Sequence, residues 1–328
     1  MSETYPSPGH EGYYVLCDGS AAECDGTLEV MTATVNVNGR VFDETNARIS
    51  VFDHGFLYGE GIYETLRTYY GEPFLFDRHM RRLRQSAEML RLVVPLSDAE
   101  IAVRFRETMR AAGLGTGDGL HEAYIRMLVT RGVGEISYDP AMCGESSVVV
   151  IVKPQVDPAP DVFEHGVRVV LVPIVRNHPG SVNPLIKSNN LLNNALAMQE
   201  AFRHGAFEGV MRNYRGELAE CTTANLFIVR DGAALTPPID AGLLAGITRE
   251  FLFDVGPAVG IPVREQVLKD DDLFLADEAF LTSTTREVVP IVQVDDRTIG
   301  SGKPGPMTKT ILAGYRQRAH AKCVVGLS

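Results

Sequence analysis

The sequence has little of what marks secreted, membrane-spanning or nucleic-acid-binding proteins. No apolar run approaches the roughly 20 residues of a membrane span, and the short run 148–152 fits a buried strand. The N-terminus has neither a basic start nor an apolar segment, so no secretion signal is predicted. Cysteines are few, odd in number and without metal-site spacing: Cys17, Cys24, Cys143, Cys221 and Cys323. We expect them to be reduced thiols of a cytoplasmic protein.

Basic residues are also too few for a nucleic-acid-binding surface. Lys and Arg number 31 against 42 Asp and Glu, which gives a formal net charge of −11. A hydrophobic content of 45% and a charged content of 22% are typical of a soluble globular enzyme. His54 and His79 have no metal-ligand pattern around them, so we predict structural histidines and no metal site.

Strand patterns outnumber helix patterns, which predicts an α+β fold. We expect a hairpin around Asn38-Gly39. The other expected strands cover 63–69, 73–76, 123–130, 147–152, 167–175, 209–212, 216–219, 225–229, 262–267 and 279–282. Helices are expected over about 80–90 and 98–112, after Lys187, from about Thr248, and from about Pro306.

The best linker candidate is the segment 154–160, because it holds three prolines and no regular pattern. It divides the chain into two expected domains of 35–153 and 161–328. Residues 1–34 lack periodicity and are expected to form an N-terminal extension.

A lysine between an expected strand and an expected helix is the first candidate for chemistry. Lys187 follows a loop with two prolines and precedes apolar residues at helical spacing, namely Leu191, Ala195, Met198 and Phe202. Its apolar neighbours 184–186 would partly desolvate the ammonium group, which favours the neutral amine that can form a Schiff base. Taken alone, the pattern fits an ordinary surface lysine better than a catalytic one.

Three further segments offer groups for binding an anion. Gly246 allows a close turn, and Thr248 can cap the helix behind it, whose free N–H groups would form an anion site. The hydroxyls of Thr284 and Thr285 follow an expected strand, and Arg82 supplies a cation. Each is an ordinary surface feature when taken separately.

Glu220 follows a hairpin turn and lies among small residues. A carboxylate there can simply be solvated. Opposite a pyridine nitrogen, it would keep that nitrogen protonated and make the ring an electron sink.

Together these segments resemble the class IV, or fold-type IV, pyridoxal-phosphate aminotransferases. That family includes branched-chain and D-amino acid aminotransferases, (R)-selective amine transaminases and aminodeoxychorismate lyases. The resemblance covers roughly residues 35–317 through motifs in the family's order: VNGR, ARISVFDHGFLYGEGIYETLR, FDRHMRRL, AYIRMLVTRG, IKSNNLLNN, GELAECTTANLF, LLAGITRE, LTSTTREVVP and GPMTKTI.

The resemblance implies a cofactor, pyridoxal 5′-phosphate, and a role for each matching position. Lys187 would be the Schiff-base lysine and the proton carrier between substrate Cα and cofactor C4′, and Glu220 would pair with the pyridine nitrogen. The phosphate would be held by Arg82, the backbone amides of Ile247 and Thr248, and Thr284, with Leu244 packed on the ring.

The family fold implies a small N-terminal α/β domain and a larger cofactor-binding domain with a β-barrel-like core. The cofactor would lie between the two domains. A partner subunit completes the substrate pockets in this family, so a homodimer or higher homo-oligomer is expected.

The substrate side resembles branched-chain aminotransferases most closely. Tyr124 would help to seat the α-carboxylate, and Arg126 would accept the distal carboxylate of glutamate. The remaining implied substrate-binding residues are Phe56, Tyr58, Tyr63, Thr284 and Thr285.

Several positions depart from the branched-chain pattern. Glu64 to Arg67 replace the usual EGIR, and Leu192 stands where a tyrosine usually contacts the cofactor's 3-oxygen. KSNNLL is closer to the D-amino acid enzymes, but the Arg and His that those enzymes carry after VTRG are absent from 134–137. The (R)-amine pattern SD-x-x-Y is absent as well, and Glu64 replaces a threonine typical of the lyases.

The sequence therefore favours a ping-pong transaminase for hydrophobic, branched-chain-type L-amino acids and 2-oxoglutarate. The alternatives are a D-amino acid or (R)-amine transaminase, then an aminodeoxychorismate lyase, and finally a non-enzymatic relative that keeps only the fold.

Overall fold

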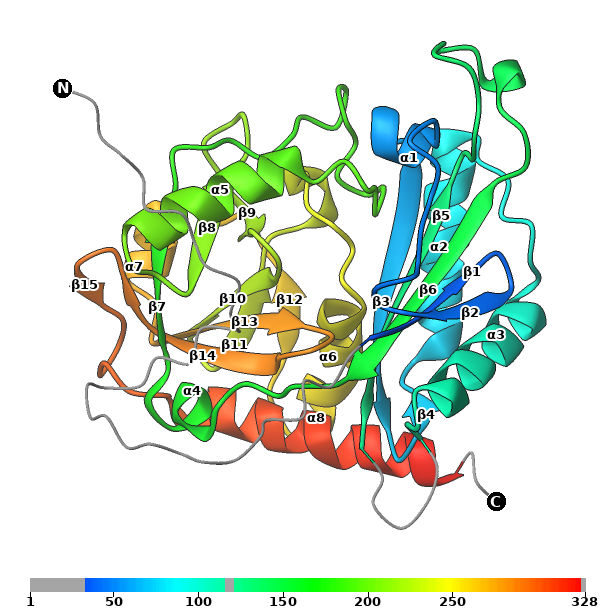
Figure 1. Ribbon diagram of the computed structural model, residues 1–328. Helices are drawn as coiled ribbons and strands as arrows, with labels where there is room; N and C mark the ends of the chain where they lie inside the picture. Colours follow the sequence, from blue (N-terminus) through cyan, green and yellow to red (C-terminus); the bar gives the residue numbers. More distant parts are fainter. Residues whose placement is uncertain (1–32, 116–120, 326–328) are drawn as a thin grey trace, which may run out of the picture. The chain divides into compact units, whose positions relative to one another are not determined.

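The computed structural model describes residues 33–115 and 121–325, with the side chains of 323–325 left out. The expected extension 1–34 lies almost entirely outside the described residues. The described residues belong to one compact unit, and its strands form two separate sheets (Figure 1).

The first sheet has six strands, all paired antiparallel in the order β2-β1-β6-β5-β3-β4. They are β1 (Thr34–Val37), β2 (Arg40–Asp43), β3 (Gly61–Tyr69), β4 (Glu72–Pro73), β5 (Ala123–Thr130) and β6 (Ser147–Pro154). Helices α2 (Phe76–Leu90) and α3 (Asp98–Ala111) bury Met80, Leu83, Ile101 and Phe105 against the sheet. Ser97 and Glu100 form a capping box that fixes the start of α3.

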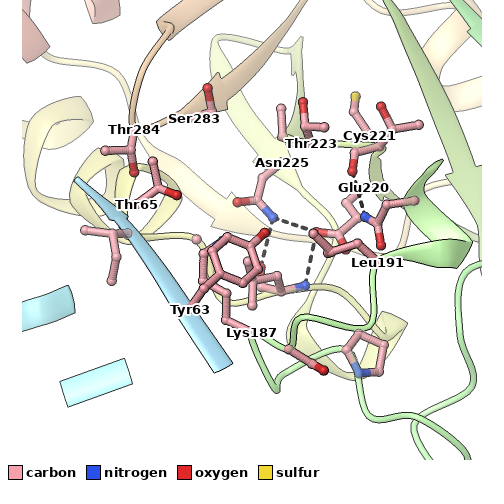
Figure 2. Close-up of a pocket in the computed structure, with 18 of the residues that line it drawn as sticks. Tyr63, Thr65, Lys187, Leu191, Glu220, Cys221, Thr223, Asn225, Ser283 and Thr284 are labelled. Atoms are coloured by element: carbon pink, nitrogen blue, oxygen red, sulfur yellow. Dashed lines mark hydrogen bonds between the residues drawn. The ribbon is translucent and has the colours of Figure 1, made fainter. Parts of the chain in front are cut away.

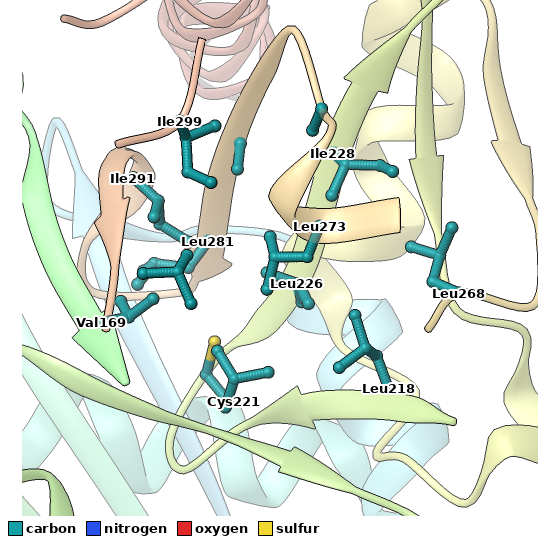
Figure 3. Close-up of a cluster of buried hydrophobic side chains, with 14 of the residues drawn as sticks. Val169, Leu218, Cys221, Leu226, Ile228, Leu268, Leu273, Leu281, Ile291 and Ile299 are labelled. Carbon is teal, nitrogen blue, oxygen red and sulfur yellow. The ribbon is translucent and has the colours of Figure 1, made fainter. Parts of the chain in front are cut away.

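The second sheet has nine strands in the order β12-β11-β10-β13-β14-β7-β8-β9, with β15 on β14. They are β7 (Val167–Leu171), β8 (Glu208–Arg212), β9 (Leu218–Cys221), β10 (Asn225–Arg230), β11 (Ala233–Thr236), β12 (Val263–Glu265), β13 (Glu278–Ser283), β14 (Glu287–Val294) and β15 (Arg297–Thr298). The sheet curls until β9 returns beside β10, where the Cys221 N–H donates to the Ala224 carbonyl at 2.8 Å. Its inner face buries a cluster that includes Leu226, Leu273 and Leu281 (Figure 3).

Six further α-helices and two short 3₁₀ turns complete the described chain. They are α1 (His54–Leu57), α4 (Pro160–His165), α5 (Leu192–Arg203), α6 (Ile247–Ala258), α7 (Asp270–Phe274), α8 (Pro306–Val325), η1 (Pro140–Met142) and η2 (Ile239–Ala241). Phe251 of α6 and Tyr315 of α8 pack against Phe74, with ring centres 5.4 and 5.9 Å from that of Phe74. Among the described residues, no helix combines the length and apolar character needed to cross a membrane.

Most of the expected elements are confirmed, with boundaries that shift by a few residues. The strand expected at 73–76 is wrong, because only Glu72 and Pro73 pair with β3. Leu75 adopts a left-handed conformation with φ of 52° and turns the chain directly into α2, which begins at Phe76. Strand β14 was not expected, because Pro290 inside it argues against a central strand.

Two expectations about helices also need correction. The helix after Lys187 exists, but it buries Ala197 and Ala201 rather than the apolar residues that predicted it, and Phe202 is 67% exposed. These alanines allow α5 to lie close to β8. A Cβ added at Gly209 of β8 would be only 3.2 Å from the Ala197 carbonyl oxygen. At α6 the N-cap is Gly246, and no side chain caps the helix.

Candidate active site

One cavity of about 350 Å³ is lined by residues from both sheets and from the segments between them. Most of the residues singled out from the sequence lie in its wall: Tyr63, Arg82, Tyr124, Arg126, Lys187, Glu220, Leu244, Ile247, Thr248, Thr284 and Thr285. Figure 2 labels part of this wall, with side chains that come from β3, β9, β10 and β13.

Lys187 is fixed through its main chain rather than through its amine. The Tyr63 N–H donates to the Lys187 carbonyl at 2.9 Å, and the Asn189 N–H donates to the Gly61 carbonyl at 2.9 Å. Residue 61 must be a glycine, because a Cβ there would lie 2.4 Å from Asn189 Nδ2. The Lys187 N–H donates to the Ser86 hydroxyl of α2 at 3.1 Å.

The amine of Lys187 lies 4.5 Å from the centre of the Tyr63 ring. Within the described part of the chain it makes no hydrogen bond or ion pair. A lysine amine on an aromatic face without a carboxylate partner is available for bonding to a ligand.

Glu220 is a buried carboxylate in β9 with every oxygen occupied. Oε1 accepts from Arg176 Nε at 2.7 Å, while Oε2 accepts from the Leu244 N–H at 3.0 Å and from the Asn225 amide at 3.3 Å. Burial raises the pKa of Glu220, whereas the charge and hydrogen bond of Arg176 oppose that rise. A further cation in the cavity would therefore favour the ionised carboxylate.

The N-terminus of α6 offers unpaired backbone donors to the cavity. Ile247 and Thr248 line the cavity, and their N–H groups have no acceptor among the described residues. Gly246 allows this start, because a Cβ there would lie 1.8 Å from Asn225 Oδ1. Arg82 approaches the same turn, with Nη1 donating to the Ala245 carbonyl at 2.8 Å. Free N–H groups beside a guanidinium form an anion-binding site.

A buried carboxylate, Glu64, orients the side chain of Arg82. Its Nε and Nη2 donate to the two Glu64 oxygens at 2.8 and 2.7 Å, and His79 Nδ1 lies 2.7 Å from the same carboxylate. Although burial alone would raise it, the charge of Arg82 lowers the pKa of Glu64 to about 2. The buried carboxylate thus balances the charge of Arg82 and fixes the orientation of its guanidinium.

An aromatic and cationic wall comes from β3 and β5. The Arg126 guanidinium of β5 lies 4.2 Å from the centre of the Tyr63 ring of β3. Among the described residues, Arg126 has no carboxylate partner. An unpaired guanidinium that lines a cavity is suited to an anionic ligand.

Phe56 and Tyr58 are the two predicted site residues that do not line the cavity. Phe56 is 66% exposed, and Tyr58 packs on His54 and Tyr138 with ring centres 4.9 and 5.1 Å apart. Their role in a pocket completed by a second subunit stays a prediction.

The sequence did not single out several residues of the wall: Thr65, Arg176, Asn190, Asn194, Thr222, Thr223, Asn225, Thr282, Ser283 and Arg286. Most lie inside the motifs quoted for the family resemblance, so the motifs were a usable signal. No local pattern pointed to Arg176, which precedes its partner Glu220 by 44 residues.

Comparison with known proteins gives one family. Residues 61–294 match the model of the family described as amino-transferase class IV. A Methanocaldococcus jannaschii protein, provisionally named a branched-chain-amino-acid aminotransferase, is 38% identical over 282 residues, which are 86% of this chain and 95% of that protein. The D-alanine aminotransferase of Staphylococcus haemolyticus is 30% identical over 284 residues, 86% of this chain and 96% of that enzyme.

The fold is also that of a solved enzyme of this class. The branched-chain amino acid aminotransferase from Thermobaculum terrenum, solved in its cofactor-bound PLP form, superposes with a TM-score of 0.77 at 26% identity. The match covers 88% of this chain and 94% of that one.

Proposed function

Because the chain belongs to the class IV aminotransferases, we propose that it transfers amino groups between a hydrophobic, branched-chain-type L-amino acid and 2-oxoglutarate, with pyridoxal 5′-phosphate as cofactor. The observation that carries this proposal is the amine of Lys187, which has no partner among the described residues, in one cavity with a buried carboxylate, Glu220. The family match supports the reaction class, and the names of similar proteins support the substrate class.

The residues of the cavity fit a phosphorylated pyridine aldehyde. The free N–H groups of α6 beside Arg82 suit the phosphate, and Leu244 offers an apolar surface for the ring. Glu220 suits a protonated ring nitrogen. The Thr282 hydroxyl is buried in the same wall without a hydrogen-bond partner among the described residues, so a polar ligand atom would satisfy it.

When bound, the cofactor supplies an aldehyde carbon that takes up the amino group and a ring that draws electrons from the substrate Cα. Lys187 is the residue for bonding to that carbon and, once released, for carrying a proton between substrate Cα and cofactor C4′. Its main chain is held by Tyr63 and Ser86, so the amine moves only through rotations of its own side chain.

Glu220 keeps the ring nitrogen protonated in this proposal. Because the carboxylate is buried, its attraction to a positive ring nitrogen is little screened by water. Arg176, Asn225 and the Leu244 N–H hold the carboxylate in one orientation before the cofactor arrives.

Arg126 supports 2-oxoglutarate as the amino acceptor. Its guanidinium has no carboxylate partner among the described residues, and it stacks on Tyr63, whose other ring contact is the Lys187 amine. A distal carboxylate on the acceptor would pair with Arg126, while a branched side chain would pack on the tyrosine rings of the same wall. Tyr124 would seat the α-carboxylate.

The test is a set of half-reactions followed by the absorbance of the bound cofactor. L-Leucine, L-glutamate, D-alanine and (R)-1-phenylethylamine are each mixed with the cofactor-loaded enzyme without a keto acid. We expect L-leucine and L-glutamate to convert the cofactor to its amino form fastest and only once per site, which is the ping-pong pattern. Continued turnover without a keto acid would instead indicate an elimination enzyme.

A second candidate function is transamination of D-amino acids. The D-alanine aminotransferase relative supports it. Leu192 supports it as well. The branched-chain resemblance implies a tyrosine at this position in contact with the cofactor, but Leu192 is 66% exposed and lies outside the cavity wall. Faster conversion by D-alanine than by L-leucine would establish this alternative.

A homodimer is part of the proposal, because apolar side chains gather at the surface near α1. Segments 51–58 and 133–138 lie together through the Asp53–Val133 bridge and the contact of Tyr58 with Tyr138. They expose Val51, Phe52, Phe56, Val133, Ile136 and Tyr138. A second copy of the chain would cover this apolar surface.

A further inference from the structure

Arg286 is an arginine of the cavity wall that none of the roles above uses. It lies in the turn between β13 and β14, directly after Thr285, and its side chain is 19% exposed. A charged side chain in this position either holds the wall together or meets the ligand.

The guanidinium of Arg286 is held through Nε and Nη2, and its Cζ lies 5.4 Å from the centre of the Phe207 ring. Nη2 donates to Glu208 Oε1 at 2.9 Å and to the Thr223 hydroxyl at 2.5 Å, and Nε lies 3.2 Å from the Ser283 hydroxyl. Glu208 is fully buried behind this contact and also accepts a hydrogen bond from the Thr222 hydroxyl. Within the described residues, Nη1 has no hydrogen-bond partner.

A purely structural role would account for only part of this arrangement. The bonds of Nη2 and Nε tie β8, the β9–β10 turn and the β13–β14 turn together. They leave the two hydrogens of Nη1 unpaired in a side chain that lines the cavity. The buried carboxylate of Glu208 stabilises the charge of Arg286 before any ligand binds and fixes the plane of its guanidinium.

The charges of the cavity wall favour an anionic ligand. One carboxylate, Glu220, lines the cavity together with five cationic side chains: Arg82, Arg126, Arg176, Lys187 and Arg286. Arg82 and Arg176 already have buried carboxylate partners. Arg126 comes from the six-stranded sheet and Arg286 from the nine-stranded sheet, so two different parts of the wall present donors to a ligand.

We propose that Arg286 binds a carboxylate of the substrate through Nη1 and so selects amino and keto acids over amines that lack a carboxylate. This inference rests on the proposed transaminase function. A monocarboxylate such as leucine would use Arg286 as its only arginine, and a dicarboxylate such as glutamate would use Arg286 together with Arg126. The bound carboxylate then completes the hydrogen bonds of the guanidinium.

The test is equilibrium binding of three unreactive ligands to the cofactor-loaded wild type and Arg286→Gln, measured by calorimetry. The ligands are 4-methylvalerate, glutarate and the uncharged 4-methylvaleramide. We expect Arg286→Gln to bind both carboxylates more weakly, 4-methylvalerate by roughly tenfold, and the amide unchanged, because a hydrogen bond to a charged group is lost. Arg286→Lys should restore part of the affinity, since it keeps the charge and loses the fork.

Two further variants separate ligand binding from folding. Arg286→Gln leaves Glu208 buried without its cation, so the double variant Glu208→Gln/Arg286→Gln removes both charges and is judged by the same binding ratios. Arg212→Gln is the matched control, because Arg212 lies in β8 of the same sheet, pairs with Asp270 of α7 and does not line the cavity. We expect wild-type affinities in the control.

Unchanged affinity for both carboxylates, or an equal loss for the amide, would overturn the role of Arg286. The proposed function is checked separately on the wild type with L-leucine. A wild type that converts L-leucine while Arg286→Gln binds carboxylates normally disproves this inference alone. A wild type that does not convert any amino acid disproves the proposed function instead.

Discussion

Two charged pairs of the site join residues that lie far apart in the sequence. Glu220 meets Arg176 across 44 residues, and Arg82 meets Glu64 across 18. The sequence indicated Lys187, Glu220 and Arg82 because their motifs are short and local. It could not indicate Arg176 or Glu208, since only the pairing of β8 with its neighbours brings these two residues to the site.

Glu64 gives a prediction about pH. The charge of Arg82 lowers the pKa of Glu64 to about 2 from 4.5, so the ionised carboxylate stabilises the fold above about pH 4.5. That contribution is lost as the pH falls toward 2. Glu64→Gln leaves Arg82 buried without a counter-charge and should lower the free energy of unfolding at pH 7 by about 3–5 kcal/mol.

The measurement is denaturant unfolding of both apoproteins between pH 7 and pH 2. The difference between wild type and Glu64→Gln should be constant down to about pH 5 and should shrink below it. A difference that stays the same at every pH would mean that Glu64 is not ionised in the native protein.

At the scale of helices and strands, sequence periodicity predicted correctly that most elements exist. It was less successful in predicting which residues of an element are buried. The helix after Lys187 was expected from its large apolar residues, yet α5 buries Ala197 and Ala201, because small side chains allow close contact with β8. Strand β14 was missed because Pro290 occupies a central position. Both errors arise where tertiary packing overrides a local preference.

Helix α6 gives a prediction about one glycine. Its N-cap Gly246 has a φ of −69°, which any residue can adopt, so space alone decides a substitution. Gly246→Ala would place Cβ 1.8 Å from Asn225 Oδ1 and push the first turn away from the cavity. We expect apoprotein stability to fall by about 1–3 kcal/mol and cofactor affinity to fall with it.

Denaturant unfolding and titration with pyridoxal 5′-phosphate measure the two effects. Gly144→Ala is the control, because the nearest atom to a Cβ there is the Val133 carbonyl oxygen at 3.6 Å. Equal behaviour of Gly246→Ala and Gly144→Ala would show that the start of α6 does not hold the phosphate.

For the whole molecule, the ordered motifs were sufficient to predict an α+β fold of this family, and the two sheets and the family match confirm it. They also predicted most of the cavity wall. They did not predict that Phe56 and Tyr58 would lie outside it. A motif fixes the position of a residue along the chain, whereas a pocket built from two subunits depends on an interface that one chain does not contain.

The apolar surface near α1 gives a prediction about assembly. Light scattering should give at least twice the 35.8 kDa mass of one chain. Replacing Phe56 and Ile136 by serine removes two large exposed apolar side chains and should shift the protein toward a monomer. Phe202→Ser is the control, because Phe202 is equally exposed but lies on α5. A wild-type monomer at micromolar concentration would contradict the proposed dimer.

The most direct test of the account is where the cofactor attaches. Borohydride reduction of the protein loaded with pyridoxal 5′-phosphate, followed by peptide mass mapping, should find the phosphopyridoxyl group on Lys187 and on no other lysine. A label on a different lysine, or no label on any peptide, would contradict the proposed active site.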